Sequence, residues 1–99
     1  MVKVLIERRF RKDEAAKAEE FLIELRTKAL RMRGYVGGET LSSVEEPFFL
    51  VTVSTWADEA SWKAWESSRE RKEIMKRMEP LLASPEKISV FRVLSASGT

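Results

Sequence analysis

Apolar residues alternate with polar ones in four segments of the chain, and this pattern predicts four β-strands. The first spans residues 2–10, where the apolar side chains share one face with a single arginine, Arg8. The others span residues 35–44, 48–56 and 88–94, and residues 48–56 are the richest in β-branched and aromatic side chains. Only a short polar turn separates the second strand from the third, so we expect these two to pair as a hairpin.

Two segments with the period of an α-helix lie between these strands. In the first, apolar residues recur every three or four positions between Asp13, the expected N-cap, and Gly34, which is expected to follow the helix C-terminus. Asp58 is expected to cap a second helix, and the pattern Ser67-x-x-Glu70 predicts that a new helix or a kink begins there. Pro80 should end or bend this last helical segment.

The order β-α-β-β-α-β is that of the ferredoxin-like α+β fold, in which a four-stranded antiparallel sheet carries its helices on one face. We expect a single domain over residues 1–95, followed by a disordered tail over residues 96–99. Apolar residues nevertheless occur on both faces of the predicted sheet. Because a large exposed apolar face usually marks an interface, we predict a homodimer that packs sheet against sheet. The residues on the face without helices are Leu5, Phe49, Val51, Val53, Phe91 and Val93.

The composition narrows the possible chemistry. The 99 residues include no cysteine and no histidine, which excludes disulfide scaffolds, zinc–thiolate sites, cysteine nucleophiles and histidine-based catalysis. The net charge is only +2, from 18 basic and 16 acidic residues, and it argues against a dedicated nucleic-acid binder. The first residues include no long apolar stretch, so we expect no secretory signal, and the charges are too evenly spread for a membrane span. We therefore expect a cytoplasmic protein. The charged run Arg69–Glu73 is expected to be a solvated helix face.

Several residues are candidates for a binding site, and each has two interpretations. Trp56, Trp62 and Trp65 lie close together in the sequence and either line a cavity for a flat aromatic ligand or fill the core. An arginine in an apolar row needs a partner or a water-filled space. Arg8 therefore either binds an anionic group in a pocket, or pairs with a glutamate at the exposed end of its strand. The hydroxyl of Tyr35 could donate to a phenolate, or the residue could be structural.

The two glycines that follow Tyr35 leave a similar choice. Gly37 and Gly38 fall inside the second predicted strand. They either leave room for a flat ligand or mark a β-bulge.

Three stretches of the chain resemble the antibiotic biosynthesis monooxygenase (ABM) family: FLVTVSTWAD at residues 49–58, SWKAWES at residues 61–67 and ISVFRV at residues 88–93. The resemblance covers nearly the whole chain and implies a dimeric α/β barrel. It is more specific for the fold than for an activity. Characterised members of the family include cofactor-free oxygenases that convert phenolic polyketides to quinones, and also haem-degrading oxygenases. Others act in small-aldehyde signalling chemistry or have no known reaction.

The haem-degrading branch implies three functional positions, of which this sequence keeps one. Trp65 matches the tryptophan of the second helix, whereas the asparagine of the first strand is replaced by Arg8. The histidine of that branch falls near Met75. Met75 or Met78 could ligate iron in principle, but a methionine on an apolar helical stripe is more often part of the core.

These observations together predict an ABM-like monooxygenase that oxidises a small aromatic or phenolic substrate without a metal, flavin or other cofactor. Trp65 and Arg8 are the expected catalytic residues, and Tyr35, Trp56 and Met75 are expected to bind the substrate. The alternative is a non-catalytic dimer of the same fold that binds small ligands or acts in stress, favoured by the missing catalytic polar residues. A haem-binding protein is a third hypothesis, and the absent histidine weakens it.

Overall fold

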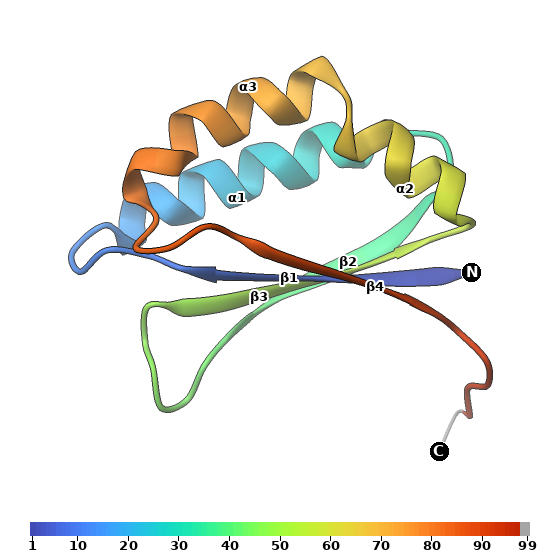
Figure 1. The fold of residues 1–99 in the computed structure, drawn as a ribbon, viewed down its shortest axis with the longest axis horizontal. Coiled ribbons are helices and arrows are strands. Elements are labelled where there is room, and N and C mark those ends of the chain that lie inside the picture. The colour runs from blue at the N-terminus through green and yellow to red at the C-terminus, as the bar shows by residue number, and fades with distance from the viewer. Residues whose placement is uncertain (98–99) are drawn as a thin grey trace.

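The computed structural model describes residues 1–97 and contains a four-stranded sheet with helices on one side (Figure 1). Strand order across the sheet is β2-β3-β1-β4, and all neighbouring strands are antiparallel. The predicted ferredoxin-like fold is thereby confirmed, with the second helical region divided into two α-helices. The elements in chain order are β1 (Val2–Arg9), α1 (Ala15–Ala29), β2 (Tyr35–Ser42), β3 (Phe49–Trp56), α2 (Glu59–Glu66), α3 (Arg69–Met78), the 3₁₀-helix η1 (Glu79–Leu81) and β4 (Lys87–Arg92).

The hydrophobic core lies between the sheet and the helices. Strand β1 is central and contributes Val4, which is completely buried, while α3 contributes Met78, which is also completely buried. Helices α1 and α3 run side by side across the sheet, and an ion pair between Glu24 and Arg77 joins them at the surface (Figure 1). The inner face of β1 therefore has helices above it along most of its length.

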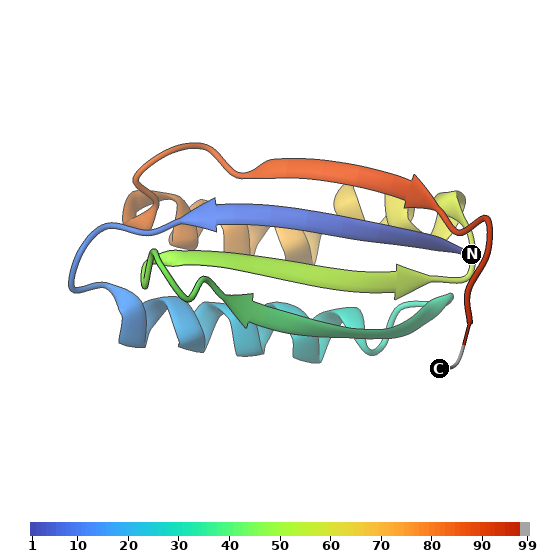
Figure 2. The ribbon, with the colours of Figure 1, turned by 90° about the horizontal axis from the view of Figure 1, so that it is seen from below.

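The opposite face of the sheet carries no helix, as the view in Figure 2 shows. On this face Leu5 pairs with Val53 across β1 and β3, and both side chains are only half-buried. Phe91 on the edge strand β4 is 54% exposed. The alternation in the sequence thus correctly placed apolar side chains on both faces. None of the helices in residues 1–97 has the length and hydrophobicity of a transmembrane span.

Some predicted boundaries are confirmed and others are wrong. Asp58 caps α2 as predicted, because its carboxylate accepts a hydrogen bond of 2.8 Å from the Ser61 amide. Asp13 does not cap α1: it adopts a left-handed conformation with φ of 69°, and Glu14 occupies the N-cap position without a side-chain bond. The cap of α3 is Ser68 and not Ser67, since the Ser68 hydroxyl accepts from the Arg71 amide.

The ends of α1 and β4 also differ from the predictions. Helix α1 ends several residues before Gly34, which still adopts the expected left-handed conformation with φ of 87°. The pairing of β2 with β3 shifts in register between Tyr35 and Gly37, as in a β-bulge, which is one of the two interpretations of the paired glycines. Strand β4 ends at Arg92, and residues 93–97 form no helix or strand. Part of the predicted tail, residues 98–99, lies outside the described residues.

Candidate functional site

A cavity of about 60 Å³ lies between the helices and the inner face of the sheet. Its exposed lining residues, Arg26, Gly38, Glu39 and Thr40, come from α1 and the edge strand β2, so its mouth lies between these two elements. The volume has room for a few water molecules but is well below that of ordinary ligand pockets. A ring-sized ligand therefore requires some of the lining groups to move.

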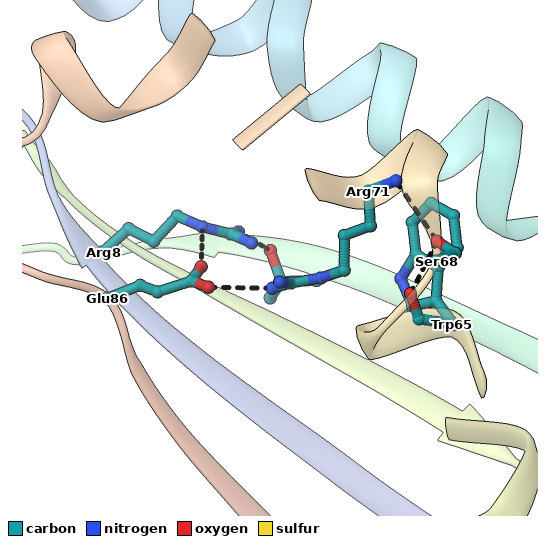
Figure 3. A network of polar contacts seen from close by, with 6 residues as sticks. Arg8, Trp65, Ser68, Arg71 and Glu86 are labelled. Atoms are coloured by element: carbon teal, nitrogen blue, oxygen red, sulfur yellow. Dashed lines mark hydrogen bonds and ion pairs between the residues drawn. The ribbon is translucent and has the colours of Figure 1, made fainter. Parts of the chain in front are cut away.

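A cluster of buried charges forms one wall of this cavity. Arg8 from β1 and Arg71 from α3 are 2% and 5% exposed and reach toward each other from opposite layers (Figure 3). The Nε of Arg8 donates to Oε2 of Glu86 at 3.0 Å, and Nη2 of Arg71 donates to Oε1 at 2.9 Å. Nη1 of Arg8 also donates to the Thr52 hydroxyl on β3, at 3.1 Å. The cluster thus joins the sheet, α3 and the segment that precedes β4.

The buried cluster carries an excess of positive charge. Burial lowers the pKa of Arg8 from its ordinary value; Glu86 raises it and the Arg71 cation lowers it. Arginine nevertheless remains charged in proteins because its ordinary pKa is so high. Two guanidinium groups therefore share the single carboxylate of Glu86. An anion that enters the cavity meets an electrostatically favourable wall.

Ser68 fixes the position of this charged wall relative to an aromatic side chain. Its hydroxyl donates to the Trp65 carbonyl at 2.7 Å and accepts from the Arg71 amide at 3.2 Å (Figure 3). Ser68 is thus both the N-cap of α3 and the link between α2 and α3. Through this serine, the backbones of Trp65 and Arg71 are held in a fixed relation.

Aromatic side chains form the other wall. Tyr35 and Trp56 meet edge to face with their ring centroids 5.1 Å apart, and Trp56 and Trp62 are 6.0 Å apart in a similar geometry. The indole N–H of Trp56 donates to the Ser54 hydroxyl at 3.0 Å. Trp65 completes this wall and is 4% exposed, so all three tryptophans of the chain line the cavity.

The hydroxyl of Tyr35 is available to a ligand. It makes no hydrogen bond to any residue within the described chain, although Tyr35 lines the cavity. Burial raises the pKa of Tyr35, against an opposing effect of Arg26, so the hydroxyl stays protonated at neutral pH and can donate. A Cβ atom on Gly38 would lie 2.9 Å from this hydroxyl oxygen. Gly38 therefore makes room for the tyrosine itself.

The sequence of this chain matches a known protein family. The model of the antibiotic biosynthesis monooxygenase family, ABM, matches residues 1–77. The chain belongs to the ABM family. No curated protein matches it.

Solved structures of low sequence identity share the fold of this ABM protein. A conserved protein from Methanosarcina mazei is 20% identical, with a TM-score of 0.86 over 92% of this chain and 90% of that one. A protein from Deinococcus radiodurans is 12% identical, with a TM-score of 0.90 over 100% and 98%. A mutant of SnoaB, a cofactor-independent oxygenase from Streptomyces nogalater, is 13% identical, with a TM-score of 0.85 over 96% and 94%.

The structure brings four of the five predicted site residues of this ABM protein together. Arg8, Tyr35, Trp56 and Trp65 all line the cavity, whereas Met75 lines a separate depression next to the loop before β4. Arg8 does pair with a glutamate, but it does so in the buried interior and not at an exposed strand end. The assigned roles of all five residues remain predictions.

Two residues of the charged wall, Arg71 and Glu86, were not predicted from the sequence. Arg71 belongs to the charged run that was expected to be solvated, and its 5% exposure corrects that expectation. A signal was present, because Arg71 precedes Ile74 and Met78 by three and seven positions and thus shares their buried face. Glu86 follows Pro85 in a loop and shows no periodic pattern, so nothing in the local sequence indicated its role.

The residues of the cavity do not fit haem. Its lining includes no histidine, cysteine or methionine. Tyr35 is the remaining residue of a type that ligates haem iron, and its raised pKa disfavours the tyrosinate form. Among residues 1–97, no group of three or more His, Cys, Asp or Glu side chains is arranged to hold a metal ion.

Proposed function

We propose that this ABM protein is a cofactor-independent monooxygenase that oxidises a small phenolic substrate. The observation that carries the proposal is the composition of the cavity, with aromatic rings on one side and two buried arginines that share one carboxylate on the other. Such a site suits a flat ring that bears a developing negative charge. Family membership and the fold shared with a cofactor-independent oxygenase support the same conclusion.

In this reaction the substrate supplies the electrons. The phenol loses its proton, and the phenolate passes one electron to O₂. The phenoxyl radical and superoxide combine to form a ring hydroperoxide, which loses water and leaves a quinone. One oxygen atom enters the ring and the other leaves as water with the two hydrogens of the substrate, so no external reductant is needed.

The residues of the cavity would assist at the first step. Arg8 and Arg71 stabilise the phenolate and lower the pKa of the bound phenol, which allows ionisation without a histidine base. Trp65 stacks on the ring and orients it, and Tyr35 donates a hydrogen bond to the anionic oxygen. The low polarity of the surrounding tryptophans strengthens these interactions.

Oxygen uptake with a panel of phenols and hydroquinones tests this proposal. We expect Arg8→Gln to lose about two orders of magnitude in rate, the size of effect seen when an anion-stabilising donor is removed. The matched control is Arg9→Gln, because Arg9 is the neighbouring residue, points to the other face of the sheet and pairs with the exposed Glu46. Equal loss in both variants, or no uptake with any compound, contradicts the proposal.

A non-catalytic ligand-binding protein is the second candidate. It is favoured by the composition of the cavity, where no lining residue is an unpaired buried carboxylate or a histidine that could act as a base. In that case the same compounds quench the tryptophan fluorescence, while no oxygen is consumed. Quenching and uptake measured together on the same compound separate the two candidates.

We further propose that the protein is a homodimer that packs through the face of the sheet that carries no helix. Apolar side chains cross this face from β1, β3 and β4, and charges of both signs surround them, as a self-complementary interface requires. Sedimentation tests this: Val53→Lys should give a monomer, and Leu30→Lys, at an exposed position on the helical side, should remain a dimer. A monomeric native protein at micromolar concentration overturns the proposal. A cytoplasmic location remains a prediction.

A further inference from the structure

Glu86 stands between the cavity and a second, open depression. Its carboxylate contacts both arginines of the cavity wall, and the residue also lines the depression next to Met75 and Pro85. That depression has a volume of about 450 Å³. The Glu86 side chain is 17% exposed, whereas its two partners are buried. The carboxylate is therefore the part of the charged wall that solvent can reach.

The backbone around Glu86 has few attachments. The Ala83 amide donates to the Arg9 carbonyl at 2.7 Å, and pairing with β1 resumes at Lys87. Within residues 1–97, the intervening segment Ser84–Glu86 makes no hydrogen bond except those of the Glu86 carboxylate. This carboxylate can therefore leave the arginines without breaking any other hydrogen bond.

The two arginines are arranged to hold a carboxylate in particular. Arg8 donates to one oxygen of Glu86 and Arg71 donates to the other, so both oxygens are bound by different guanidinium groups. The remaining N–H groups of both guanidiniums, apart from the one on Thr52, make no hydrogen bond to a described residue. A planar carboxylate on a small molecule can satisfy the same two donors and additional ones.

The size of the cavity points in the same direction. At about 60 Å³ it is smaller than an aromatic ligand requires, and departure of the Glu86 side chain would add its space and connect the cavity to the open depression. We infer that Arg8 and Arg71 form a carboxylate site for an aromatic acid, and that Glu86 occupies this site until the ligand displaces it. The ring then lies against Trp65 and Trp56. This inference rests on the proposed function in using the same cavity and the same two guanidinium groups, which would bind the carboxylate of an aromatic acid in place of a phenolate oxygen.

Tryptophan fluorescence tests the inference directly, because all three tryptophans line the cavity. The probes are benzoate and benzamide, which have nearly the same shape but differ in charge. We expect benzoate to bind at least about tenfold more tightly, the minimum that a charged hydrogen bond of ordinary strength provides. Equal affinities, or no quenching by either compound, overturn the inference.

A pair of glutamine variants tests the displacement. Glu86→Gln keeps the shape of the side chain but removes its charge, so benzoate should bind about tenfold more tightly than in the native protein. Glu79→Gln is the control, since Glu79 lines the same depression without contacting either arginine, and it should bind benzoate like the native protein. Unchanged or weaker benzoate binding in Glu86→Gln contradicts the displacement.

Thermal unfolding keeps the test informative if Glu86→Gln is unstable. Benzoate should raise its melting temperature more than that of the native protein, because the ligand replaces the missing carboxylate. An equal or smaller rise contradicts the inference. The binding measurements do not depend on turnover, so the two proposals can fail separately. Oxygen uptake with neutral phenols but no preference for benzoate overturns the carboxylate site alone. Benzoate binding without any oxygen uptake overturns the oxygenase alone.

Discussion

Arg8 in the central strand and Arg71 in the first turn of α3 are bound to the two oxygens of the same carboxylate, that of Glu86. This contact holds α3 to the sheet at the level of the cavity. Because both arginines are buried, removal of the carboxylate leaves their charges without a partner. The stability of the fold and the chemistry of the site therefore depend on the same three residues.

Glu86→Ala should destabilise the protein by about 2–3 kcal/mol, somewhat less than for a fully buried ion pair because Glu86 is partly exposed. Urea unfolding measures the change. The control is Glu79→Ala, an exposed glutamate of the same region, for which we expect less than about 0.5 kcal/mol. Similar effects of the two substitutions would show that the shared carboxylate contributes little.

Ser68→Ala should cost about 1 kcal/mol, the usual contribution of an N-cap. It should also weaken ligand binding, because Ser68 links Trp65 to Arg71. The neighbouring Ser67 is the C-cap residue of α2, where its hydroxyl donates to the Lys63 carbonyl, and it does not cap α3. Ser67→Ala should therefore change stability by less than about 0.5 kcal/mol. A larger effect at Ser67 would favour the capping box expected from the sequence over the cap that the structure shows.

Gly38→Ala should destabilise the protein by about 1–3 kcal/mol, since the new Cβ would lie 2.9 Å from both the Val53 carbonyl oxygen and the Tyr35 hydroxyl. It should also displace Tyr35 from its place in the cavity. Gly37→Ala is the matched control, because a Cβ atom there meets nothing within 4 Å. Thermal melts of both variants check this, and equal melting temperatures would contradict the close packing at Gly38.

The ionisation of Tyr35 can be followed without interference from another phenol, because it is the only tyrosine of the chain. Burial raises its pKa, so the midpoint of tyrosinate absorbance should lie higher in the folded protein than in urea. The neutral form is the one favoured by folding. Its contribution to stability is thus complete below the pKa of the unfolded chain, about 10, and is lost as the pH rises through the folded value. A folded midpoint at or below the unfolded one would contradict a buried hydroxyl.

Sequence patterns predicted the fold well because its elements depend on regular periods. The alternation of Val4 with Leu5 in β1 placed one inside and the other on the open face, as the structure shows. The charged site depends instead on contacts between distant segments. Glu86 meets Arg8 across 78 residues of sequence, and no local period records such a pair.

Capping residues show the same contrast on a smaller scale. Asp13 is of a residue type that suits an N-cap, but it adopts a left-handed conformation, and the helix begins only after Glu14. Asp58 suits a cap equally well and does form one. Which candidate is used depends on how the preceding strand ends, and that is determined by packing.

We propose that the protein oxidises a phenol in this cavity with O₂ as the only oxidant. The most direct test is turnover of a phenol by the purified protein under oxygen gas labelled with the heavy isotope, followed by mass spectrometry of the quinone. We expect the quinone to carry one labelled oxygen atom, labelled water to form with it, and Arg8→Gln to suppress both. A quinone without label, or equal labelling by the native protein and the variant, would contradict the proposal.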